Sequence, residues 1–133
     1  MTVGYFESAF GFDILCNDIA SLDENIEMVT VLNHKGRSIE MKVKEGIEMD
    51  LTPVKKEMFF MQSVLQTSMN KDQDDEFGRV KCTIFERERS TVFSFEFFNH
   101  VILVVSRSIS NPMHLKSSIS DKIANIKKVE LVQ

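Results

Sequence analysis

The sequence predicts an α+β domain with a five-stranded antiparallel sheet in the order 2-1-5-4-3 and the element order α-β-β-α-β-β-β-α. Residues 26–32 and 101–106 are short segments that are apolar on both faces, which is typical of strands in the middle of a sheet. Between them, residues 52–76 carry the longest helical periodicity of the chain. If the two doubly apolar strands are neighbours, the other strands take the remaining places and the long helix crosses one face of the sheet.

The first part of the chain predicts a helix followed by a hairpin. Apolar residues recur at helical spacing over residues 7–20, although Gly11 weakens this helix by about 1 kcal/mol relative to alanine. The period then changes to two, so that residues 26–32 form a strand, residues 33–36 a turn and residues 37–43 a return strand. The return strand has one polar face with lysine, which is typical of a sheet edge.

The central helix begins with a good cap. Thr52 is suited to the N-cap and Pro53 to the first helical position, while Gly78 ends the helix. An apolar stripe repeats along one side, and we expect it to lie on the sheet; it consists of Val54, Met58, Phe60, Met61, Val64, Leu65 and Met69. Phe59 falls among polar residues, on the face that we expect to be exposed.

Three more strands and a helix complete the chain. Residues 80–88 and 90–98 predict a hairpin joined by the charged segment ERERS, with Phe93, Phe95 and Phe97 on one face of its second strand. A turn at residues 99–100 leads into the doubly apolar strand 101–106. Asn111 and Pro112 then open a last helix, and the state of the final VELVQ is left open.

Length and composition describe one globular domain, residues 1–133. The chain is 43% apolar and 27% charged, which is the balance of a folded protein. Its net charge of −4 argues against binding nucleic acid through a basic face. Because no apolar run is long enough to span a membrane and the N-terminus lacks a secretory leader, we expect a cytoplasmic protein.

The residues that carry chemistry form no recognisable site, so we expect no metal, no cofactor and no catalytic centre. Cys16 and Cys82 lack a CxxC spacing, and we expect two buried thiols rather than a disulfide. The sequence contains no nucleophile elbow, P-loop or GxGxxG motif. The acidic residues at the end of the central helix lack the spacing of a calcium loop, so we expect a solvated helix end: Asp72, Asp74, Asp75 and Glu76.

Five segments carry a resemblance to known proteins: IEMVTVLNHKGRSIE, EMFFMQSVLQTSM, DDEFGRV, VFSFEF and HVILVVS. They are similar to a family of short uncharacterised archaeal proteins, and the element order resembles the roadblock/LC7 fold, a relative of longin and profilin-like domains. Thr30, Arg79 and Glu96 depart from that family's usual glycine, proline and proline. No catalytic residues are assigned in the family. The matching positions are Asn33, Lys35, Gly36, Arg37, Phe60, Met61, Leu65, Phe77, Gly78, Val80, Ser94, Phe95 and Ser106.

The resemblance implies a homodimer, because in roadblock-like proteins the equivalent helix pairs with its twofold mate and the third strands join into one sheet. An aromatic residue on a polar helix face is also typical of an interface. The alternative is that Phe59 packs under the first or last helix of its own chain. The expected interface consists of Lys55, Phe59, Gln62, Ser63, Gln66, Lys81, Thr83 and Phe85.

These features predict a non-enzymatic interaction module that dimerises and presents a sheet-helix platform to a protein partner. Fold analogy suggests a small GTPase as that partner. The turn residues Lys35, Gly36 and Arg37 could contact a phosphate or an acidic partner surface, although a turn itself needs glycine and tolerates charge.

The alternative function is a PAS- or GAF-like sensor domain. In that case a small-molecule cavity would be lined by Met28, Met41, Met58, Met61 and Met69 together with Phe93, Phe95 and Phe97. An internal pocket with convergent polar groups would favour the sensor, and a solid core would favour the interaction module.

Overall fold

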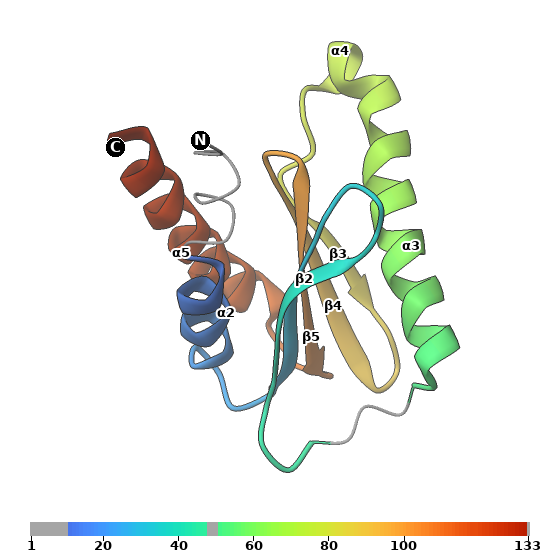
Figure 1. Ribbon diagram of the computed structural model, residues 1–133, viewed down its shortest axis with the longest axis vertical. Coiled ribbons are helices and arrows are strands. Elements are labelled where there is room, and N and C mark those ends of the chain that lie inside the picture. Colours follow the sequence, from blue (N-terminus) through green and yellow to red (C-terminus); the bar gives the residue numbers. More distant parts are fainter. Residues whose placement is uncertain (1–10, 48–50, 133) are drawn as a thin grey trace.

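The computed structural model describes residues 11–47 and 51–132 and shows a sheet between two layers of helices (Figure 1). Over these residues no helix is both long and apolar enough to cross a membrane. The elements, labelled as in Figure 1, are α2 (Phe12–Ala20), β1 (Ile26–Leu32), β2 (Ser38–Val43), α3 (Pro53–Asn70), the 3₁₀ turn η1 (Lys71–Gln73), α4 (Asp74–Phe77), β3 (Thr83–Glu86), β4 (Ser90–Phe97), β5 (His100–Arg107) and α5 (Pro112–Val132).

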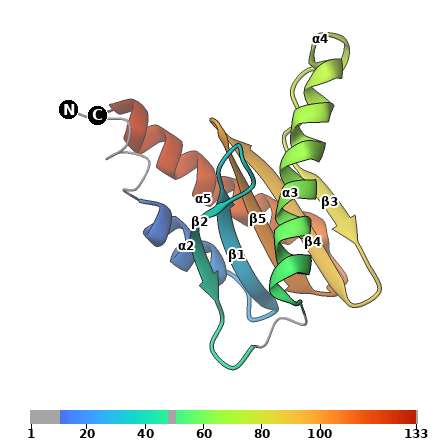
Figure 2. The ribbon, with the colours of Figure 1, turned by 45° about the vertical axis from the view of Figure 1, so that its right-hand side comes forward.

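The sheet has the predicted order, β2-β1-β5-β4-β3, and all neighbouring strands are antiparallel. β1 and β5 pair in the middle, for example Thr30 with Leu103, and both strands are buried on both faces. Helix α3 lies on one face of the sheet, and α2 and α5 lie on the other (Figure 2). The predicted α+β architecture is therefore confirmed.

The larger hydrophobic cluster lies between the sheet and the layer formed by α2 and α5. Phe93, Phe95 and Phe97 point into it from β4, on one face as predicted. The ring of Phe12 from α2 meets the ring of Phe97 edge-on, with centroids 5.8 Å apart. Cys16 is part of the same cluster, in the apolar environment that the sequence predicts.

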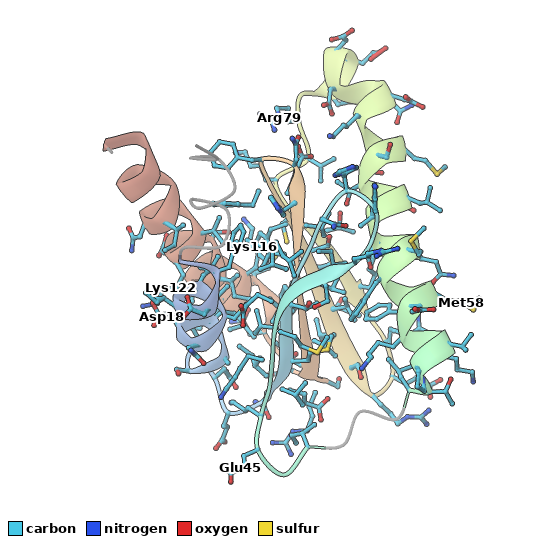
Figure 3. The ribbon with its side chains drawn as sticks, in the orientation of Figure 1. Asp18, Glu45, Met58, Arg79, Lys116 and Lys122 are labelled. Carbon is cyan, nitrogen blue, oxygen red and sulfur yellow. The ribbon has the colours of Figure 1, made fainter. Side chains whose placement is uncertain are left out.

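Helix α3 meets the sheet through a different face from the predicted one. Phe60 is 5% exposed and is the one buried residue of α3, with Phe59 and Val64 packed beside it against Met28 and other sheet residues. The expectation that the stripe of methionines lies on the sheet was wrong. Its outer members are 46–65% exposed: Val54, Met58, Met61, Leu65 and Met69. Figure 3 shows Met58 pointing away from the sheet.

The physical reason for this reversal is that α3 has two apolar arcs. The helical periodicity of the sequence reveals both apolar faces of α3, but it does not reveal which of them packs against the sheet. The aromatic rings of Phe59 and Phe60 bury more area than unbranched side chains do, and they fill the space above the buried faces of β1 and β5.

Some element boundaries also differ from the predicted ones. The long helix changes at Asn70 into the turn η1 and the short helix α4, and Gly78 ends it with a φ of 80°, as predicted. β3 is shorter than predicted, and the turn between β4 and β5 lies at Phe98 and Asn99, where Phe98 has a φ of 53°. The first predicted helix begins at Phe12, and its residues 7–10 lie outside the described residues.

Candidate protein-interaction surface

One edge of the sheet is open. β3 pairs with β4 on one side, and no strand of the described chain pairs with its other side. Phe85 lies on this edge strand and is 48% exposed. An unpaired edge that carries an aromatic side chain is a template for pairing with another chain.

A groove separates α3 from the half of the sheet next to this edge. Helix α3 packs over β1 and β5 through Phe60, which leaves part of β4 and β3 uncovered. The groove consists of two adjoining hollows of about 450 and about 650 Å³. Val92 and Phe59 line both of them, so the groove has an apolar floor along its length.

The residues predicted for a dimer interface lie around this groove. Lys81 is exposed just before β3 and is not among the lining residues. The other seven line the groove. Six of them line the smaller hollow: Phe59, Gln62, Ser63, Gln66, Thr83 and Phe85. Lys55 lines the larger hollow, together with Phe59 and Gln62, which line both. The structure thus brings together residues from two elements that are far apart in the sequence.

Phe59 packs against the sheet of its own chain and also lines the groove, while its place in a dimer interface stays a prediction. Its side chain is half-buried, 6.0 Å from Phe60 between ring centroids, and packs against the sheet from α3. It does not lie under α2 or α5, because those helices cover the opposite face. Of the polar residues expected to be exposed around it, Lys55, Gln62 and Gln66 are exposed and Ser63 is partly buried. Ser63 Oγ donates to the carbonyl of Phe59 (3.0 Å), and Thr67 Oγ1 donates to that of Ser63 (2.9 Å). These hydroxyls are satisfied by their own helix.

The outward side of α3 forms a second surface, which we call the α3 stripe (Val54, Met58, Met61, Leu65 and Met69). All five side chains are 46% exposed or more. Met58 borders the larger hollow, and Leu65 and Met69 border the smaller one, so the stripe continues into the groove. Contiguous exposed apolar surface of this kind marks protein interaction sites.

Charges of opposite sign lie at the two ends of α3. At its C-terminal end, Glu96 Oε1 of β4 accepts from Arg79 Nη2 (3.1 Å) and lies 3.7 Å from Lys71 Nζ. Lys71 and Arg79, which precede and follow the acidic residues of η1 and α4 in the sequence, therefore both pair with Glu96. At the N-terminal end, four cations line the larger hollow together with one carboxylate, that of Glu27; the cations are Lys55, Arg87, Arg89 and Arg107.

The turn between β1 and β2 has a structural explanation of its own. Asn33 Oδ1 accepts from the backbone N–H groups of Lys35 (2.9 Å) and Arg37 (3.0 Å). Gly36 has a φ of 82°, and a Cβ added there would stand 2.5 Å from Met61 Sδ of α3. The turn therefore requires glycine. The side chains of Lys35 and Arg37 are exposed, and their contact with a partner stays a prediction.

The residues proposed to line a sensor cavity do not converge. Phe93, Phe95 and Phe97 are buried toward α2 and α5, Met28 is buried on the opposite face, and the methionines of α3 are exposed. Among the described residues, no three side chains of metal-ligand type stand together. Burial raises the pKa of the Cys16 thiol to about 12 and that of the Cys82 thiol to about 11, so both are poor nucleophiles at neutral pH.

The fold can be compared with those of known proteins. No family model and no curated protein matches the chain. Among solved structures, the roadblock/LC7 domain from Streptomyces avermitilis matches with a TM-score of 0.68 and 11% identity, over 90% of this chain and 98% of that one.

The chain has a roadblock/LC7-like fold. The gliding protein MglB from Thermus thermophilus has a TM-score of 0.65 at 11% identity, over 95% of this chain and 92% of that one. A structure of MglB with tetrameric arrangement has a TM-score of 0.65 at 12% identity, over 95% and 92% of the two chains. At these identities the likeness concerns the fold, and the predicted archaeal relationship stays a prediction.

Proposed function

We propose that this chain is a non-enzymatic interaction module that forms a homodimer through the β3 edge and the groove. The observation that carries the proposal is that an unpaired edge strand and an apolar groove lie side by side, because Thr83 and Phe85 of β3 line the groove. A second copy could cover both at once. Strand pairing would satisfy the free backbone groups of β3, and the helix of the second copy would cover Val92 and Phe59.

Symmetry fixes how the second copy lies. A twofold axis perpendicular to the sheet at β3 pairs the two β3 strands antiparallel. Because α3 is fixed to its own sheet, the two α3 helices then also run antiparallel, one beside the other over the joined sheets. In this arrangement the side of α3 that faces the second copy is the groove side, which carries Lys55, Gln62 and Gln66.

The α3 stripe supplies the platform in this proposal. In the dimer two stripes lie next to each other on the outer side of the helix layer, and they form a larger apolar surface than one chain offers. We place the protein partner there and propose a small GTPase, on the analogy of the roadblock/LC7-like fold. The MglB structure with tetrameric arrangement, which has the same fold, supports self-association as a property of such domains.

Sedimentation equilibrium tests the dimer. The wild type is expected to sediment as a dimer, and Phe85→Lys as a monomer, because the lysine would place a charge at the strand junction. Ile39→Lys is the matched control, since Ile39 is 41% exposed on β2 at the opposite edge of the sheet. A monomeric wild type, or equal dissociation of both variants, would overturn the proposal.

Affinity capture tests the platform. Wild-type protein is expected to retain a GTP-binding protein from a lysate, identified by mass spectrometry and by bound nucleotide, and a Val54→Glu/Met61→Glu variant is expected to lose it. Both residues lie on the stripe away from the groove linings, so dimerisation should persist. Met113→Glu on α5, 58% exposed on the other layer, is the control. Capture that survives the stripe variant would place the partner elsewhere.

A further inference from the structure

We propose that the acidic end of α3 and α4 docks, with Phe77 as its anchor, into the cationic hollow of the second copy. This inference rests on the proposed dimer and adds the pair of sites that fixes its register. The acidic end consists of Asp72, Asp75, Glu76 and Phe77, and the cationic hollow is the larger one, rimmed by Lys55, Arg87, Arg89 and Arg107.

The acidic end has no ion-pair partner among the described residues. Asp72, Asp75 and Glu76 are exposed, and none of them forms an ion pair with another described residue. The two neighbouring cations, Lys71 and Arg79, are held by Glu96. Asp72 lies just beyond the last residue of α3, Asn70, where a negative charge also opposes the helix dipole. A cation from outside the chain would relieve both effects.

Phe77 makes this end more than a solvated charge cluster. It is 85% exposed, the highest value among the large apolar side chains of the described residues. Figure 1 shows α4 protruding beyond the sheet at one end of the molecule. An exposed aromatic ring within an acidic segment has the chemistry of an anchor for a pocket with an apolar floor and a cationic rim.

The larger hollow offers such a pocket. Its floor is apolar, with Leu51, Met58, Val92 and Val105, and its lining holds four cations against the one carboxylate of Glu27. None of the four cations is ion-paired within the described part of the chain. Lys55 stands in the first turn of α3, where a cation opposes the helix dipole. The hollow therefore favours an anionic, aromatic occupant in a chain whose overall charge is −4.

The twofold arrangement brings the two sites together. In one chain, α4 lies at one end of the molecule and the hairpin between β3 and β4, which carries Arg87 and Arg89, lies at the other (Figure 1). Antiparallel pairing at β3 reverses the second copy, so its α4 lies toward the end of the first copy where this hairpin stands (Figure 1). The contact occurs twice in the dimer, and each helix end then faces charges that complement its dipole.

Charge exchange between two variants tests the inference. The acid-reversed variant carries Asp72→Lys, Asp75→Lys and Glu76→Lys, and the base-reversed variant carries Arg87→Glu and Arg89→Glu. In a homodimer of either variant, like charges face each other at both contacts. We therefore expect the dissociation constant of the dimer to rise on the order of a hundredfold at low salt and less at high salt. Mixed in equal amounts, the two variants are expected to form a heterodimer with affinity near that of the wild type.

The controls separate register from folding and from dimerisation as such. Reversal of Asp18, Asp121 and Lys122, which lie on α2 and α5, is expected to leave the dimer unchanged (Figure 3 labels Asp18 and Lys122). Phe77→Ser is expected to weaken the dimer roughly tenfold, and Met113→Ser to have no effect. Circular dichroism shows whether each variant is folded.

The outcomes distinguish the two proposals. A dimeric wild type whose affinity is unchanged by both charge reversals would overturn the docking inference and leave the proposed dimer standing. Weakened variants that fail to form a heterodimer on mixing would also overturn it, since the charges would then not face each other. A wild type that stays monomeric would remove the proposed dimer and this inference together.

Discussion

The reversed face of α3 makes Phe60→Ala the most informative substitution. Phe60 is 5% exposed and packs against Met28, Leu32 and Leu103 of the sheet, whereas Val54 at the N-terminal end of the stripe is 65% exposed. If the stripe faced the sheet instead, the two residues would exchange roles. The two truncations therefore measure which side of the helix holds the fold together.

The magnitude follows from the buried area. A phenylalanine side chain buries about 150–250 Å², which at about 25 cal/mol per Å² corresponds to roughly 4–6 kcal/mol, and alanine retains a small part of it. Measured substitutions of this kind cost about 3–5 kcal/mol. Because the groove beside Phe60 lets the neighbouring side chains relax, we expect about 3 kcal/mol for Phe60→Ala. For Val54→Ala we expect a change within about 0.5 kcal/mol.

Urea unfolding followed by circular dichroism measures both values. Repeating it at two protein concentrations separates the stability of the chain from that of the dimer. Equal losses for both variants, or a larger loss for Val54→Ala, would refute the assignment of the buried face.

Three further predictions concern single positions. Gly36→Ala should destabilise the fold by about 1–3 kcal/mol, because Gly36 has a positive φ and the sulfur of Met61 stands close to it. In thermal unfolding, a second substitution, Met61→Ala, should recover part of this loss. Full recovery would mean that the positive φ contributes nothing to the loss. Burial lowers the pKa of His100, so below about pH 6.5 the unfolded chain takes up a proton more readily than the folded chain, and the free energy of unfolding should fall. His100→Gln should make this fall with decreasing pH less steep. An unchanged dependence of stability on pH would contradict the prediction. Burial raises the pKa of Cys16 from 9.0 to about 12, so the thiol ionises first in the unfolded chain, and the free energy of unfolding should fall as the pH rises through this interval. In Cys16→Ala the free energy of unfolding should fall less steeply with pH. Equal pH dependence in the wild type and the variant would contradict a buried thiol.

Much of the architecture could be predicted because strand burial leaves a direct pattern in the sequence. Residues of β1 and β5 are apolar on both faces, which only the middle of a sheet allows, and this alone placed two strands. The cap at Thr52, whose hydroxyl accepts from the N–H of Lys55 (3.2 Å), and the stop at Gly78 are local signals that need no tertiary information.

The orientation of α3 could not be predicted in the same way. The helix has apolar residues on two sides, Phe60 and Val64 on one and the stripe on the other, and a single sheet can bury only one of them. That excess of apolar surface was the available signal for an exposed stripe. The register between the β3 hairpin and α3 was not available from the sequence, so the convergence of Lys55, Arg87 and Arg89 on one hollow was missed.

The ion pair between Arg79 and Glu96 joins two segments that are far apart in the sequence. Arg79 Nη2 lies 3.1 Å from Glu96 Oε1, and this pair ties the segment after α4 to β4. Figure 3 shows Arg79 at the same end of the molecule as α4. The two residues are 17 positions apart, so their ion pair could not be predicted from the sequence without knowing that the two segments are neighbours in the fold.

Hydrogen exchange at the backbone amides of β3, Thr83–Glu86, tests the central claim most directly. If a second copy pairs with this edge, the amides that do not bond to β4 become slow to exchange as the protein concentration rises, and in Phe85→Lys they exchange fast at every concentration. Fast exchange of those amides in the wild type, even at concentrations where it sediments as a dimer, would contradict a dimer built on β3.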